Sequence, residues 1–297
     1  MITLDKLKPG DIVPGDYRLT TKLSKHKYFM ATWRATSTGG DDVALNLYST
    51  TTYDSDPGYD PHDLHEAFEV LLPTLELLRT LPPTPGLAPL LNYIYDPDVL
   101  ILVRKFYHDR LNDRYPAGKI SADTVLENAR QLATTFDALR RMVPEMSFFI
   151  TPEHLMLEDD QVIVLDYGLE HLLKTIEYSY TGSRPVTARW NYEMGWYPSH
   201  LFKEGSIPPE YALALLYYYL RTGFGVFEHH DPALHAFSRI NWDGITRYGE
   251  QGTLPDVLQN ADSGEWSVIK AALARPTTFS SCAELVSALE LALHSES

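Results

Sequence analysis

The sequence is poor in cysteine and in basic residues, and it has no long apolar run. The one cysteine, Cys282, excludes an internal disulfide and any zinc site built from several cysteines. Lys and Arg number 25 against 40 Asp and Glu, which gives a net charge of −15. Such a surface repels nucleic acid and anionic membranes, so we expect neither as a partner. No stretch of about 18 apolar residues is present for a membrane span, and we expect a cytoplasmic protein.

The first third of the chain reads as short strands with one helix. Alternating apolar and polar residues, separated by turn signals such as Gly39-Gly40, predict an antiparallel sheet. The expected strands cover residues 16–23, 28–36, 43–48, 90–95 and 99–106. A helix is expected over 64–81, interrupted or begun afresh at Pro73 because proline removes a backbone donor.

The remainder of the chain reads as helices. From Ser121 to Met142 the apolar residues recur mostly at three- and four-residue steps, and Ser121 is a suitable N-cap. Further helices are expected over 209–222, 266–274 and 281–293. Strands followed by helices predict an α+β protein of two lobes, with residues 1–106 in the first and 107–297 in the second.

The segment from Thr151 to Leu169 carries a resemblance to a known family. Pro152-Glu153 and then Asp166-Tyr167-Gly168 keep the order and separation of the catalytic core of eukaryotic-type protein kinases. Five other segments are similar in the same order, namely 15–19, 43–46, 100–106, 209–223 and 269–285. The chain looks closest to bacterial Ser/Thr kinases. The resemblance implies a bilobal kinase-like fold, with a small antiparallel β N-lobe that has one helix and a larger, mainly helical C-lobe.

Most of the chemistry of that family is missing at the matching positions. Phe149 stands where the kinases have the catalytic Asp, and His154 stands where they have a metal-binding Asn. Asn46 replaces the lysine that contacts the phosphates, and the loop over residues 24–29 has no glycine. Arg104 falls near the position that borders the adenine pocket, where a long side chain would fill the cleft. The resemblance therefore implies a degenerate kinase, a pseudokinase.

Asp166 is the one retained group with chemistry. In the family it binds Mg²⁺, but an Asp before an aromatic residue and a glycine can also cap a turn, and we favour that structural role. The glutamate that pairs with the phosphate-binding lysine in kinases is ambiguous here among Glu66, Glu69 and Glu76.

Four aromatic residues mark the segment equivalent to the activation and substrate-docking loop. They are Trp190, Tyr192, Trp196 and Tyr197. They could form a protein-binding face, because interface cores are rich in aromatics and poor in charge. They could equally fold inward and fill the vacated cleft. Both alternatives are open on the sequence alone.

The function expected from these features is protein binding without catalysis. The partner would be a kinase, a phosphatase or a component of an assembly, and no cofactor is expected. One alternative is a divergent Ser/Thr kinase that uses ATP and Mg²⁺, with Lys25 or Lys27 in place of the missing lysine and Asp166 as the metal ligand. Another alternative is a nucleotide-binding switch without turnover.

Overall fold

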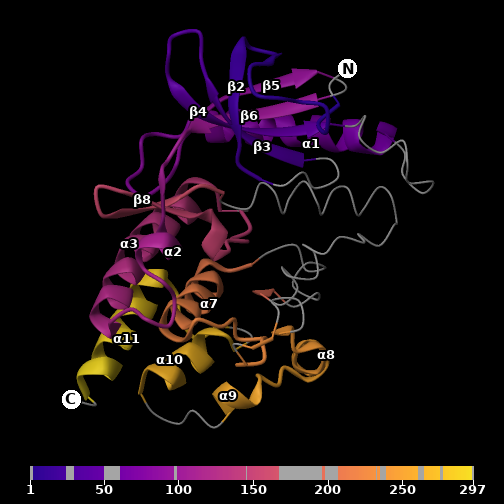
Figure 1. Cartoon of the computed structure of the whole chain (residues 1–297). Helices are drawn as coiled ribbons and strands as arrows, with labels where there is room; N and C mark the ends of the chain where they lie inside the picture. Colours follow the sequence, from indigo (N-terminus) through magenta and orange to yellow (C-terminus); the bar gives the residue numbers. More distant parts are fainter. Residues whose placement is uncertain are drawn as a thin grey trace. The chain divides into compact units, whose positions relative to one another are not determined.

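The computed structural model covers the chain in several described stretches. They are residues 3–24, 30–49, 61–96, 99–144, 146–166, 196–197, 207–231, 233–234, 239–259, 264–274 and 277–295, without the side chains of 61–67 and 257. These residues fall into two compact units (Figure 1). Unit 1 holds residues 3–83 and 88–108, and unit 2 holds residues 84–87 and the described residues from 109 onward.

Unit 1 is built on an antiparallel sheet with the strand order β1-β2-β3-β4-β6-β5. Its strands are β1 (Ile12–Val13), β2 (Tyr17–Lys22), β3 (Met30–Thr36), β4 (Asp42–Ser49), β5 (Leu90–Asp96) and β6 (Val99–Lys105). On β3 the residues Ala31, Trp33 and Ala35 are buried and alternate with less buried neighbours, as a strand of period two requires. These side chains join one apolar cluster with those of β4 and β6. The expected strands are thus confirmed over the described residues.

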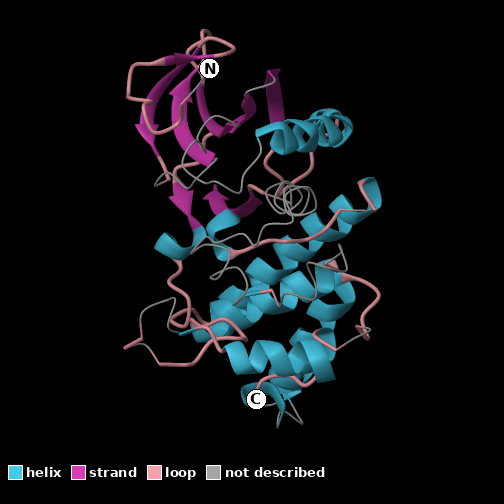
Figure 2. Ribbon diagram, turned by 90° about the vertical axis from the view of Figure 1, so that its right-hand side faces the viewer, coloured by secondary structure: helices cyan, strands magenta, loops and turns pink. Residues whose placement is uncertain are grey.

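Helix α1 (Pro61–Arg79) packs beside β5 in the same unit (Figure 2). It runs through Pro73 without a break, so the expected interruption there is wrong. Phe68, Leu71 and Leu75 recur on one face and are buried. Their burial stabilises the helix by more than the hydrogen bond that the proline removes.

Unit 2 is mainly helical. In the described part of the chain its helices are α2 (Leu111–Arg114), α3 (Ala122–Met142), α7 (Pro209–Thr222), α8 (Trp242–Gln251), α9 (Asp256–Gln259), α10 (Gly264–Ala272) and α11 (Cys282–Ser295). Ser121 caps α3 by accepting a hydrogen bond from the Thr124 N–H, as expected. Gly223 ends α7 in the left-handed conformation, with φ 80°. None of the helices in the described part of the chain has the length and hydropathy needed to cross a membrane.

Helix α8 was not expected, although its two ends carry recognisable signals. Asn241 is the N-cap and accepts a hydrogen bond from the Gly244 N–H at 2.9 Å. Gly252 follows the last residue with φ 67°, which suits a C-terminal cap.

A small sheet in unit 2 joins β7 (Asp109–Arg110), β8 (Leu155–Glu158) and β9 (Gln161–Val164). Asp159 and Asp160 connect β8 to β9, with φ of 49° and 65°. Positive φ at both central residues is what a two-residue hairpin turn of the favoured hand needs, and Asp is among the residues that tolerate it.

Four residues from the first third of the chain belong to unit 2. The Val164 N–H donates to the Gly86 carbonyl at 2.8 Å, and the Thr135 hydroxyl donates to the Pro85 carbonyl at 3.1 Å. A Cβ at Gly86 would lie 2.1 Å from the Thr135 hydroxyl oxygen, so only glycine fits there. The stretch 84–87 therefore groups with unit 2 and not with the chain on either side of it.

Candidate functional site

The loop that the resemblance relates to a kinase catalytic loop leads to one 3-10 turn, η2 (Pro152–His154), in unit 2. Phe149, which the resemblance places at the catalytic Asp, has a buried side chain. The Ile150 N–H donates to the Phe148 carbonyl at 3.0 Å, which makes a three-residue turn centred on Phe149. The Phe148 N–H donates to the Ile207 carbonyl at 3.0 Å, so the loop is also tied to the chain that enters α7.

Tyr197 packs directly against this loop. Its ring lies 4.4 Å from the Phe149 ring, centroid to centroid. Its hydroxyl donates to the Ile150 carbonyl at 2.7 Å and accepts from the Ile150 N–H at 3.2 Å. Burial raises the pKa of the Tyr197 hydroxyl, so the group stays a neutral donor.

The structure does not fit the expected partner-binding role of Trp196 and Tyr197. Trp196 is 1% exposed and Tyr197 is fully buried. The Trp196 ring packs at 5.0 Å from the ring of Tyr219, on α7. A side chain that solvent cannot reach cannot contact a partner, so the alternative of inward packing describes these two residues. Trp190 and Tyr192 lie outside the described residues.

One ring nitrogen of His154 accepts a hydrogen bond from the backbone of its own turn. Its Nδ1 accepts a hydrogen bond from the Thr151 N–H at 3.2 Å and thereby caps η2. This contact engages Nδ1 within the turn.

Asp166 is buried in unit 2 and has a partner within the chain. Its neighbours Tyr167 and Gly168 lie outside the described residues, as do Lys25 and Lys27.

Unit 1 holds two more of the positions that the sequence comparison with kinases singled out. Asn46 lies on β4, opposite Thr32 of β3 and Leu102 of β6. Arg104 lies on β6 opposite Ala44 and is 3% exposed.

Two of the three candidate glutamates are engaged with groups of unit 1. Glu76 forms an ion pair with Arg79 and accepts a hydrogen bond from the Tyr93 hydroxyl, and the bond from Arg79 lowers the pKa of Glu76 most. Glu69 interacts with Tyr95, where burial and then the charge of Glu69 raise the pKa of the tyrosine. The side chain of Glu66 is outside the described part of the chain.

Two buried ion pairs in unit 2 were not expected from the sequence. Arg140 on α3 pairs with Glu210, whose side chain is 2% exposed at the start of α7. Arg221 on α7 holds both carboxylate oxygens of Glu265 on α10, at 2.9 and 2.6 Å. The sequence gives little signal for either pair, because the partners lie on different helices.

One group of possible metal ligands occurs among the described residues, formed by Asp137, Glu210 and Cys282. Its groups already have other contacts. Asp137 accepts from the backbone N–H groups of Cys282 and Ala283, and Glu210 pairs with Arg140. Burial raises the pKa of the Cys282 thiol, which therefore stays protonated. This cluster ties α3, α7 and α11 together, and its two carboxylates already accept hydrogen bonds from Arg140 and from the start of α11.

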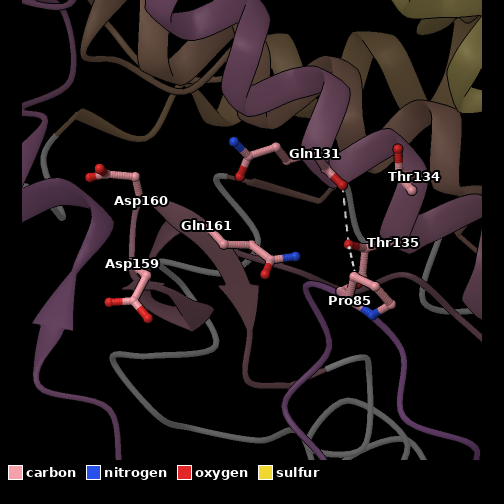
Figure 3. A pocket seen from close by; sticks show the side chains of 7 residues that line it. All are labelled: Pro85, Gln131, Thr134, Thr135, Asp159, Asp160 and Gln161. Carbon is pink, nitrogen blue, oxygen red and sulfur yellow. Dashed lines mark hydrogen bonds between the residues drawn. The ribbon is translucent and has the colours of Figure 1, made fainter.

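An open cavity of about 420 Å³ lies on unit 2 between α3, the 84–87 turn and the β8–β9 hairpin (Figure 3). The Thr135 hydroxyl is bonded to the Pro85 carbonyl, and the side chain of Gln131 accepts from the Val162 N–H. The carboxylates of Asp159 and Asp160 point away from the α3 side of the cavity (Figure 3).

Comparisons with known proteins identify the fold. No family model matches the chain, and no curated protein matches it. Many solved structures do match, among them the crystal structure of the protein kinase Rad53, residues 1–466, in complex with AMP-PNP. The likeness has a TM-score of 0.59 at 17% identity, and it covers 91% of this chain and 64% of that one. The chain thus has an α+β, protein-kinase-like fold.

Proposed function

We propose that this protein is a pseudokinase: it keeps the kinase-like fold, does not transfer phosphate, and acts by binding another protein. The proposal rests on the residue at position 149, which is a buried phenylalanine. A general base must lie within hydrogen-bond reach of the proton it removes. Phe149 has no group that accepts a proton, and its ring is buried against Tyr197.

Two further positions support the loss of catalysis. Asn46 is neutral, so it cannot supply the charge of the phosphate-binding lysine. The Nδ1 of His154 is occupied by the Thr151 N–H, so the imidazole is committed to the turn. Loss of a general base alone costs ~10² to 10⁴-fold in rate, and the other losses add to it.

Support for protein binding comes from the surface of unit 1. Val70 and Leu77 lie two turns apart on one face of α1 and are 54% and 44% exposed. Contiguous exposed apolar patches mark protein contact sites, and these two side chains share one face of the helix.

Nucleotide binding without turnover is the second candidate function. It is favoured by Asp166, which matches the metal-binding Asp of the kinases, and by the AMP-PNP bound in the Rad53 structure. Under this candidate Asp166 would hold Mg²⁺, with Lys25 or Lys27 near the phosphates.

A thermal-shift titration with ATP separates the two candidates. A ligand at 100 times its dissociation constant stabilises a protein by ~2.7 kcal/mol. We expect no shift in melting temperature with millimolar ATP, with or without Mg²⁺ or Mn²⁺. A shift that is lost in Asp166→Ala would establish the nucleotide switch.

Phosphotransfer should be absent from the natural chain and from Phe149→Asp. The new carboxylate would be buried beside the Tyr197 ring, which disfavours its charged form, and the lysine and the Asn would still be missing. The measurement is transfer of radiolabel from ATP to the chain itself and to a generic substrate protein, with Phe149→Leu as the matched variant. Transfer above a no-enzyme control would contradict the pseudokinase proposal.

A further inference from the structure

The contacts of the Tyr197 hydroxyl concentrate on one residue of the loop. The hydroxyl bonds to both backbone groups of Ile150, and the Phe148 carbonyl lies 3.4 Å away. Phe148 and Ile150 are the two ends of the three-residue turn centred on Phe149. A phenol supplies one donor and accepting lone pairs at the end of a rigid ring, which phenylalanine does not.

The surroundings of Tyr197 fix it in this place. Its ring lies tilted against the rings of Phe149 and of Tyr211 on α7, with centroid distances of 4.4 and 6.4 Å. The neighbouring Trp196 is buried against Tyr219 of the same helix. Tyr197 therefore joins the loop to the first turn of α7 across a long stretch of sequence.

We infer that Tyr197 is an internal latch, which holds the loop so that whatever side chain occupies position 149 points into unit 2. The latch, rather than the apolar character of Phe149 alone, keeps this position away from solvent. The inference rests on the proposed function only in assigning position 149 to the catalytic Asp of the kinases.

Thiol labelling tests the latch, because the natural chain should show little labelling of its own. Cys282 is the only cysteine, it is buried, and its pKa is raised, so the natural chain should react slowly with an aromatic disulfide reagent under native conditions. The variant Phe149→Cys then reports whether position 149 is accessible. We expect it to react no faster than the natural chain.

Adding Tyr197→Phe to Phe149→Cys should speed labelling about tenfold, the ratio that corresponds to one net hydrogen bond. The matched control adds Tyr248→Phe instead. Tyr248 is also buried in unit 2, and its hydroxyl donates to the Leu273 carbonyl at 2.6 Å. It therefore loses a bond donated to a backbone carbonyl, as Tyr197→Phe does, but far from the loop in sequence. Equal rates in the two double variants, or fast labelling of Phe149→Cys alone, would overturn the latch.

Amide exchange gives a second measurement that needs no change at position 149. In Tyr197→Phe the Ile150 amide loses one of its two acceptors and should exchange faster, relative to other unit 2 amides, than it does in Tyr248→Phe. Unchanged relative protection would refute the latch even if the labelled variants fail to fold. Phosphotransfer by the natural chain would instead refute the pseudokinase proposal and leave both readouts of the latch intact.

Discussion

Replacing Arg140 by methionine is expected to lower the free energy of unfolding by ~3–5 kcal/mol. The Glu210 carboxylate is buried, and Arg140 is the cation that faces it. Arg140 also donates to the Ser280 carbonyl at 2.7 Å, next to the start of α11. Removing the guanidinium therefore leaves a buried charge without its counter-charge. Urea denaturation monitored by circular dichroism measures the loss.

The same helix provides the control for this prediction. Arg130 on α3 pairs with Glu127 and Glu290, but all three side chains are at least 40% exposed. Exposed pairs contribute ~0–1 kcal/mol, so Arg130→Met should be mild. Changing both buried partners, in Arg140→Met with Glu210→Leu, should recover much of the loss. If Arg140→Met were as mild as Arg130→Met, the buried pair would not have the assigned role.

Truncation of Trp196 to alanine is expected to cost ~3–5 kcal/mol, as the removal of large buried aromatics does. Trp242, at the start of α8, is 40% exposed, and Trp242→Ala should cost much less. Trp196→Phe should fall between them, because the indole N–H has no hydrogen-bond partner among the described residues and only packing is lost. Thermal melts of the three variants provide the comparison.

This experiment also decides between the two accounts of the aromatic segment. A melting temperature that Trp196→Ala leaves unchanged would mean that the ring is exposed in solution. The protein-binding face expected at Trp196 would then stand, contrary to the burial in the structure.

The fold could be predicted from the sequence where local patterns decide the outcome. Alternation on β3 and the three- and four-residue steps of α3 each follow from the burial of one face. The prediction of a break at Pro73 was wrong. The free-energy cost of proline in a helix can be read from the local sequence, whereas the stabilising burial of Phe68 and Leu71 comes from tertiary packing. The caps Asn241 and Gly252 of α8 were present in the sequence and could have been used.

The candidate site was predictable in composition but not in conformation. Phe149 and His154 could be read as departures from a family pattern. The inward orientation of Phe149 could not, because it depends on Tyr197, 47 residues along the chain from Ile150. The ion pair of Arg140 and Glu210 could not be predicted either, because the two residues are 70 positions apart in the sequence. Such contacts are decided by tertiary structure, which a periodic pattern does not encode.

The assignment of residues 84–87 to unit 2 means that neither unit is one continuous piece of chain. A fragment cut after His108 would carry the Gly86 carbonyl away from Val164, and the Pro85 carbonyl away from Thr135. The remaining fragment would lack the hydrogen-bond partner of β9 that only the upstream chain supplies. Two such fragments should therefore behave as complementing halves, which reach their native state when mixed, and not as separable domains.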